Sequence, residues 1–117
     1  MAFDWQAYIR LARELGQLHA EGEQREAVVR SAVSRAYLGT FCHVRNSEQE
    51  HHSFQPKGKG DHGALKAHLR NTHKRRFAEM MQQLQEWREA CDYEDDAPYE
   101  TYLEKAIEQA EKIVSRF

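Results

Sequence analysis

The stretch Val29-Arg-Ser-Ala-Val-Ser-Arg-Ala-Tyr-Leu-Gly-Thr-Phe-Cys-His-Val44 decides the fold class of this 117-residue chain. Its core-type side chains recur three or four positions apart, which is the period of one face of an α-helix. These side chains are Val29, Val33, Ala36, Tyr37, Thr40, Phe41 and Val44. The pattern predicts a long helix from about Glu23 to Val44 with one face in a core.

The same period on either side of this helix predicts further helices. One is expected from Asp4, as its N-cap, to about Ala20, and Gly22 separates it from the next helix. Further along the chain, Asp61 is expected to cap a short helix that runs to about Leu69.

Two more helices complete the pattern. One is expected to begin near Asn71 or Thr72 and to end around Asp92, and the other follows a break at 93–98, with Pro98 in its first turn. No strand pattern is found. The sequence therefore predicts an all-α fold, an antiparallel up-and-down bundle of four main helices plus one short helix.

Composition fits one domain over residues 1–117. Charged residues make up 31% and hydrophobic residues 40%, with two prolines, which argues against a disordered linker. Cys42 and Cys91 lack Cys-x-x-Cys spacing, so we expect reduced thiols and a cytoplasmic protein. Neither a basic leader nor a long apolar run is found, so no signal peptide and no membrane association are expected.

Residues 46–60 break the apolar pattern. They are polar, they end in turn-forming proline and glycine residues, and they are expected to form one long loop. Long loops in small domains are frequently functional.

Charge is unevenly placed although the formal net charge is only −2. The segment 57–76 carries seven Lys and Arg residues and one acidic residue, Asp61, whereas the segment 79–104 carries nine acidic residues and Arg88. This asymmetry indicates either a local surface that attracts phosphate or two solvated faces that pair with each other.

Histidine and cysteine spacing argues against a metal site. His51, His52, His62, His68 and His73, with Cys42 and His43, lack the paired spacing that is typical of zinc ligands. We therefore expect no metal and no other cofactor.

Arg88 and Asp92 form a second chemical signal. They lie one helical turn apart, in the weaker orientation for stabilising a helix by an ion pair. A guanidinium oriented by a carboxylate suits the binding of an anion.

Three motifs in this sequence resemble those of the HEPN family. The segment Ser34-Arg-Ala-Tyr-Leu-Gly-Thr-Phe-Cys-His43 resembles the family's second-helix signature, commonly Ser-Arg-Ala-Tyr-Tyr-Ala-x-Phe-His. Asp61-His-Gly-Ala-Leu65 is similar to its Thr-His-x-x-Leu start of a short helix, and Arg88-Glu-Ala-Cys-Asp-Tyr93 resembles its Arg-x-x-Ala-Asp-Tyr helix end. The motifs occur in the family's order and cover nearly the whole chain.

The resemblance implies a four- to five-helix, usually homodimeric, bundle that cleaves RNA or binds RNA or a nucleotide. Many members are toxins or their relatives, often paired with a small nucleotidyltransferase that acts as the antitoxin. We therefore expect a protein that binds RNA or a nucleotide, as the toxin-like component of a toxin–antitoxin or defence module. The expected binding residues are Arg88, Arg35, Ser34, Lys57, Lys59 and His62.

The resemblance also identifies a departure in the expected catalytic motif. Ribonuclease members carry an arginine followed four to six residues later by a histidine, whereas Asp92 and Tyr93 follow Arg88 here. Neither residue type has an ordinary pKa near neutrality. Arg88, Asp92 and Tyr93 are thus candidates in a degenerate catalytic motif, and we expect ribonuclease activity to be weak or absent.

Two alternatives stay open. The first is an active metal-independent endoribonuclease, which would use Arg45 and His51, a literal match to the arginine–histidine spacing, or Arg88 with a histidine from the loop region, such as His51, His52 or His62. The second is a non-catalytic adaptor that binds a protein partner.

Overall fold

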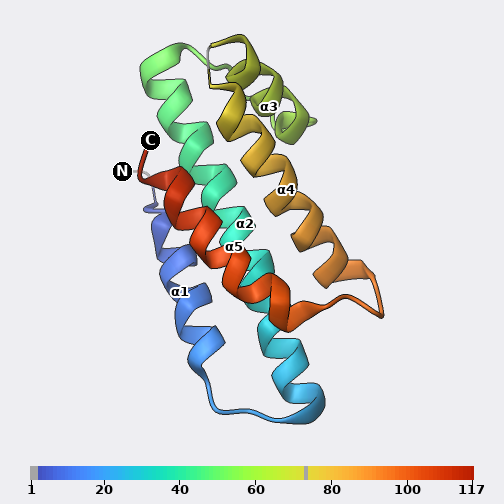
Figure 1. Cartoon of the computed structure of the whole chain (residues 1–117). Coiled ribbons are helices and arrows are strands. Elements are labelled where there is room, and N and C mark those ends of the chain that lie inside the picture. Colours follow the sequence, from blue (N-terminus) through green and yellow to red (C-terminus); the bar gives the residue numbers. More distant parts are fainter. Residues whose placement is uncertain (1–2, 73) are drawn as a thin grey trace.

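The computed structural model describes residues 3–72 and 74–117, and this part of the chain contains five α-helices and no strand (Figure 1). The helices are α1 (Gln6–Gln17), α2 (Gly22–His52), α3 (Asp61–Asn71), α4 (Arg75–Tyr93) and α5 (Tyr99–Val114). Figure 1 shows that α1 and α4 run opposite to α2 and α5, and that the start of α1 lies near the end of α5. The predicted fold class is confirmed: four main helices form an antiparallel bundle, and α3 is the short fifth helix.

Helix α2 is the central element and packs against α1, α4 and α5. The face that was predicted from its sequence period is buried throughout. Its buried residues include Val29, Val33, Ala36, Tyr37, Thr40, Phe41 and Val44. Full burial of a large apolar side chain contributes about 1.5–3 kcal/mol, so this one stripe contributes a large part of the core's stabilisation.

None of the helices in residues 3–72 and 74–117 has the length and apolarity needed to cross a membrane.

The connection between α1 and α2 follows the sequence closely. The N-cap position of α1 is Trp5 and not the predicted Asp4, but the Asp4 carboxylate still accepts a hydrogen bond from the backbone N–H of Gln6, the first residue of the helix, at 3.1 Å. Helix α1 ends at Gln17, three residues before the predicted end, and the side chain of Leu18 is consequently exposed. Gly22 has a φ of 59°, a left-handed conformation that glycine adopts without strain, and it opens α2.

The prediction of a long loop over 46–60 is wrong, because α2 continues to His52 and only residues 53–60 connect it to α3. The extra turns contain Glu48, which is fully buried and accepts a hydrogen bond from Lys74 at 2.9 Å. Polar tertiary contacts thus stabilise these turns where no apolar stripe continues. Ser53, with a φ of 60°, ends the helix in the left-handed conformation.

The boundaries around α3 also differ from the prediction. Helix α4 begins at Arg75, later than the expected 71 or 72, because α3 extends to residue 71. Asp61 is the first residue of α3 and does not cap it; its carboxylate accepts the backbone N–H groups of Lys57 at 2.9 Å and Gly58 at 2.7 Å. Asp61 therefore closes the preceding loop. His73, one of the histidines weighed as a metal ligand, lies outside the described residues.

Arg30 fastens the centre of the bundle to the end of α4. Its Nη1 donates to the backbone carbonyls of Cys91 at 2.9 Å and Glu94 at 2.7 Å, and its Nη2 donates to that of Asp95 at 2.9 Å. These carbonyls belong to a helix end, where backbone acceptors lack partners within the helix. The arginine thereby fixes the end of α4 that carries Arg88.

Candidate functional site

Aromatic and charged side chains from α2, α3 and α4 meet around Tyr37. The Tyr37 hydroxyl lies 2.5 Å from Nδ1 of His62, and the His62 ring stacks on Phe41 with 3.8 Å between ring centroids and 7° between planes. On α4, Cζ of Arg88 lies 5.9 Å from the centroid of the Tyr37 ring. His62 and Arg88, distant in sequence, are therefore both neighbours of Tyr37.

We call this group the Tyr37 cluster. It comprises Ser34, Tyr37, Phe41, His62, Arg88 and Asp92. Tyr37 and Phe41 lie one turn apart on α2 and therefore share a face. His62 is the second residue of α3, and Arg88 is one turn before Asp92 on α4. Helical periodicity thus sets the spacing within each helix, and the packing of the three helices brings the sets together.

The expected pairing of Arg88 with Asp92 is confirmed. Nε of Arg88 lies 2.8 Å from Oδ2 of Asp92, as an ion pair and not as an aligned hydrogen bond. Ser34 Oγ donates to the same Oδ2 at 3.3 Å. The Arg88 side chain is 23% exposed, and its Nη1 and Nη2 make no hydrogen bond with any residue in the described part of the chain. Asp92 therefore holds one edge of the guanidinium and leaves the other edge free for a ligand.

Burial and charge set the protonation of the two ring groups at the centre. Burial raises the pKa of the Tyr37 hydroxyl, and the nearby charge of Arg88 only partly opposes this effect. Burial lowers the pKa of His62, and the positive charges of Arg88, Lys66 and Arg45 lower it further. At neutral pH the cluster therefore holds a neutral phenol bonded to a neutral imidazole.

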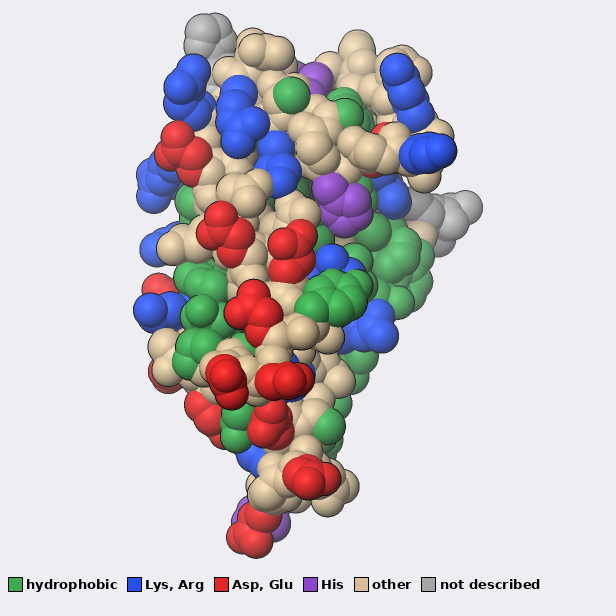
Figure 2. Space-filling model, turned by 90° about the vertical axis from the view of Figure 1, so that its right-hand side faces the viewer, with side chains coloured by type: hydrophobic (Ala, Val, Ile, Leu, Met, Phe, Trp, Pro, Cys, Tyr) green, Lys and Arg blue, Asp and Glu red, His purple; other side chains and the backbone are tan. Residues whose placement is uncertain are grey.

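The basic segment 57–76 and the acidic segment 79–104 meet where α3 packs on α4, and Arg70 and Arg76 line one hollow together with Glu79 and Glu86. Among the described residues no ion pair joins the two segments. In Figure 2, Lys and Arg side chains gather on the upper part of the face and Asp and Glu side chains on the lower part. Lys57 and Lys59 are exposed on the loop that leads into α3, close in sequence to His62. The charge pattern therefore combines both alternatives: opposite charges mix beside α3 and the start of α4, whereas Lys57 and Lys59 lie exposed on the loop before α3.

The structure does not place Arg35 beside Arg88 in the Tyr37 cluster. Cζ of Arg35 lies 5.2 Å from the centroid of the Tyr8 ring on α1, on a different side of α2 from Ser34. Neighbouring residues of a helix point about 100° apart, which explains why Ser34 joins the cluster and Arg35 does not. Tyr93, the last residue of α4, is 76% exposed.

The structure also separates Arg45 from His51. Both lie on α2, and a spacing of six residues directs side chains about 120° apart. Cζ of Arg45 lies 5.8 Å from the centroid of the Phe41 ring, at the edge of the Tyr37 cluster. His51 instead lines a hollow together with Trp5. The literal arginine–histidine spacing in the sequence therefore does not bring the two side chains together on one face of α2.

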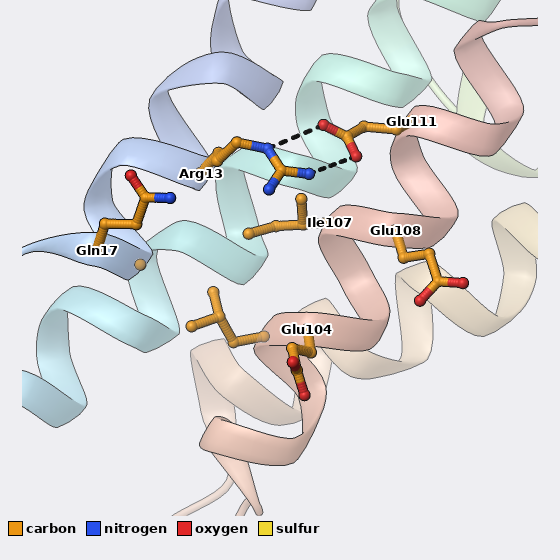
Figure 3. Close-up of a pocket in the computed structure, with 8 residues that line it drawn as sticks. Arg13, Gln17, Glu104, Ile107, Glu108 and Glu111 are labelled. Atoms are coloured by element: carbon orange, nitrogen blue, oxygen red, sulfur yellow. Dashed lines mark hydrogen bonds and ion pairs between the residues drawn. The ribbon is translucent and has the colours of Figure 1, made fainter.

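A hollow of about 440 Å³ lies between α1 and α5 (Figure 3), and no motif or spacing in the sequence predicted it. It is lined by Arg13, Gly16, Gln17, Leu103, Glu104, Ile107, Glu108 and Glu111. The guanidinium of Arg13 is already paired with the carboxylate of Glu111, at 2.5 and 3.1 Å. The other charged groups of the lining are glutamates, so this hollow is unsuited to phosphate.

The remaining candidates for reactive or metal-binding groups are buried or dispersed. Within residues 3–72 and 74–117, no three His, Cys, Asp or Glu side chains are placed to hold a metal ion. Cys42 and Cys91 are buried free thiols. Burial raises the pKa of both, that of Cys91 to about 11, so neither is a reactive thiolate at neutral pH.

No protein-family model matches the chain, and searches of curated proteins and of solved structures find no match either. What the chain does must therefore be inferred from its own residues and their geometry.

Proposed function

We propose that this chain is a HEPN-type protein that binds RNA or a nucleotide through the Tyr37 cluster. The observation that supports the proposal is the meeting of all three motifs that carry the resemblance. Ser34 and Tyr37 come from the first motif, His62 from the second, and Arg88 with Asp92 from the third. Three short segments far apart in the sequence thus supply one site.

Arg88 is the anchor of the proposed site. A guanidinium presents parallel N–H groups that fit two oxygens of a phosphate, and the free edge of Arg88 is available for this contact. Asp92 and Ser34 orient the group from the other side. Lys57, Lys59 and Arg45 add positive charge nearby, which attracts a phosphate backbone independently of sequence.

Replacement of Arg88 tests this function. The substitution Arg88→Ala should weaken binding of a single-stranded RNA by about 30-fold, since a charge-assisted hydrogen bond contributes about 2 kcal/mol. The melting temperature should change by only a few degrees, because the Arg88–Asp92 ion pair is partly open to water and such pairs contribute about 0–1 kcal/mol. Fluorescence anisotropy and thermal unfolding of the same samples measure both effects.

Two variants control this experiment. Arg10→Ala removes an arginine whose ion pair with Asp4 is largely exposed on α1, and it should leave binding unchanged. Arg88→Lys keeps the charge but loses the paired N–H groups, so its affinity should lie between wild type and Arg88→Ala. Loss of folding without a specific binding defect would identify Arg88 as structural. Binding should also weaken as salt concentration rises, because phosphate contacts release counterions.

An active metal-independent endoribonuclease is the second candidate, and the shared contact of His62 and Arg88 with Tyr37 favours it over the other arginine–histidine pairings. A neutral imidazole near a free guanidinium could move a proton while the arginine stabilises charge on phosphate. The missing histidine after Arg88 still leads us to expect weak or absent cleavage.

Cleavage assays separate the two candidates. Wild type, His62→Ala, His51→Ala and Arg88→Ala are incubated with structured and single-stranded RNA in the presence of EDTA. Strong cleavage that is lost in His62→Ala and Arg88→Ala but kept in His51→Ala would establish the enzyme. Binding without cleavage by wild type supports the binding function.

The resemblance also proposes a biological setting for the chain. We propose a cytoplasmic homodimer that forms the toxin-like component of a two-gene module with a nucleotidyltransferase-type antitoxin. A neighbouring reading frame for a nucleotidyltransferase would support this setting. Absence of such a gene, together with absence of RNA binding, would favour a protein-interaction adaptor.

A further inference from the structure

The Tyr37 cluster leaves three nitrogen atoms open to a ligand. Nη1 and Nη2 of Arg88 and Nε2 of His62 make no hydrogen bond with any residue in the described part of the chain. The two arginine nitrogens form the free edge opposite Asp92. Nε2 of His62 is the ring nitrogen that Tyr37 does not bind.

The charges around His62 come from all three helices of the site. Arg45 on α2, Lys66 on α3 and Arg88 on α4 are positive, and Asp61 on α3 is negative. Lys66 is buried and bonded to the neutral side chains of Gln82 and Gln85. Burial is the main reason that the imidazole stays neutral, and the positive charges of Arg88, Lys66 and Arg45 add to it against the opposing charge of Asp61.

Two carboxylates act on the neighbours of His62 and not on His62 itself. Asp92 pairs with Arg88, and Glu89, also on α4, acts on Lys66 and on Tyr37. Neither is among the charges that shift the pKa of His62, which are those of Arg88, Lys66, Asp61 and Arg45.

Tyr37 can support either protonation state of His62. A phenolic hydroxyl donates to the bare Nδ1 of a neutral imidazole, and its oxygen accepts from the Nδ1–H of an imidazolium. Stacking on Phe41 fixes the ring in both cases. A proton can thus be gained or lost at His62 without moving its neighbours.

We propose that the Tyr37 cluster selects a terminal phosphate, a phosphomonoester, over an internal phosphodiester, and that His62 takes up a proton from solvent when this group binds. The inference rests on the proposed RNA- or nucleotide-binding function and names the group that the site takes.

The charge of the ligand provides the physical reason. A phosphomonoester has its second ionisation near pH 6, so it carries close to two negative charges above neutrality, whereas an internal diester carries one. The second charge should favour a protonated His62 against the burial and the neighbouring cations that keep the free ring neutral. In the neutral ring Nε2 already carries the hydrogen, so the proton is taken up at Nδ1 and the Tyr37 hydroxyl changes from donor to acceptor. The positive charge that results makes the hydrogen bond from Nε2–H to phosphate charge-assisted, in addition to those from Arg88.

Three probes test this inference: a five-residue uridylate RNA with a 5′-phosphate, its twin with a 5′-hydroxyl, and uridine monophosphate. We expect the two monoesters to bind more tightly than the hydroxyl twin. Their affinity should fall as pH rises from 6.5 to 8.0, by up to about tenfold per pH unit, which is the limit for uptake of one proton. The hydroxyl twin should show no such dependence. Comparison of the phosphorylated RNA with the mononucleotide distinguishes an RNA end from a free nucleotide as the source of the group.

Histidine variants provide the controls. His62→Gln should lose both the preference for the monoester and the pH dependence, while binding that depends on Arg88 remains. His51→Gln removes an exposed histidine outside the cluster and should behave as wild type. If His62→Gln does not fold, NMR titration of the His62 imidazole in the wild-type protein tests the same inference. We expect the pKa of His62 to rise when uridine monophosphate saturates the site.

The possible failures are distinguishable. Equal, pH-independent binding of the phosphorylated and hydroxyl RNAs, or an unchanged pKa of His62, overturns the inference and leaves the proposed binding function intact. Absence of binding by all three probes overturns both.

Discussion

At the scale of single residues, Glu48 is a buried carboxylate with three basic partners. Its side chain is fully buried, and Oε2 lies 2.9 Å from Nζ of Lys74 and 2.8 Å from Nδ1 of His52, while Oε1 lies 3.2 Å from Nε2 of His68. Burial raises the pKa of this carboxyl, but the hydrogen bond and charge of Lys74, with those of His52, outweigh burial and hold the pKa below its ordinary value. Glu48 therefore ties the end of α2 to α3 and to the residue before α4.

Removal of this carboxylate should cost much of the protein's stability. We expect Glu48→Gln to lower the free energy of unfolding by about 3 kcal/mol at pH 7, the low end for breaking a buried ion pair, because Lys74 and His52 still reach water. Since the folded pKa lies below the unfolded value of 4.5, the stabilisation is present above pH 4.5 and is lost as pH falls through the folded pKa.

Urea unfolding at pH 7 and at successive values below 4.5 measures this prediction. The difference between wild type and Glu48→Gln should shrink toward the acidic end. Glu50→Gln, an exposed neighbour on the same helix, should stay within about 0.5 kcal/mol of wild type throughout. A gap between wild type and Glu48→Gln that does not change with pH would contradict the role of the ionised carboxylate.

At the scale of elements, the crossing of α1 over α2 depends on Gly39. A Cβ atom at this position would lie 2.8 Å from the backbone oxygen of Trp5 and 2.9 Å from Cβ of Tyr8. Contacts this short force a shift of backbone, which cannot move aside as a flexible side chain can. Glycine is therefore what lets the two helices approach closely at this point.

We expect Gly39→Ala to destabilise the protein by about 1–3 kcal/mol, the usual cost of overpacking a core. Gly63→Ala is the matched control, because Gly63 also lies in a helix but has no neighbouring atom within 4 Å of the added Cβ. Alanine there should stabilise the protein by about 0.4–1 kcal/mol. Thermal or urea unfolding measures the stability of both variants relative to wild type. Equal stability of the two variants would contradict a tight α1–α2 contact.

At the scale of the whole molecule, the described chain leaves several large apolar side chains uncovered. Phe3, Leu11, Leu18 and Tyr93 are 54%, 41%, 51% and 76% exposed. Leu11 and Leu18 are seven positions apart on or just after α1, so they lie on similar sides of it. A bundle of 117 residues has limited means to cover such surface alone.

We expect a homodimer in solution. Light scattering at tens of micromolar protein should give about twice the monomer mass of 13.8 kDa. The double variant Leu11→Ser/Leu18→Ser tests whether these two residues contribute to the contact, and a lower mass would show that they do. A mass near 13.8 kDa for wild type across the concentration range would contradict the prediction.

The sequence by itself determined the helices whose core faces are apolar. Periods of three and four residues located α1, α2, α4 and α5 and identified a buried stripe in which Tyr37 and Phe41 are both enclosed. Local chemistry also determined the hydrogen bond that Asp4 accepts at the start of α1 and the break at Gly22. These features depend on local backbone conformation and on the spacing of apolar residues along one helix face. A short segment encodes both in its own residue order.

Only the tertiary structure decided which polar groups meet. The final turns of α2 form although they have no apolar stripe. They are stabilised by polar partners on another segment, such as Lys74, which binds Glu48. The neighbourhood of His62 and Arg88 exists only because α3 and α4 both pack beside Tyr37. The spacing of apolar residues in a segment encodes which face of its helix is buried. Which side chain of another helix lies against that face depends on how the helices cross, and no single segment contains that information.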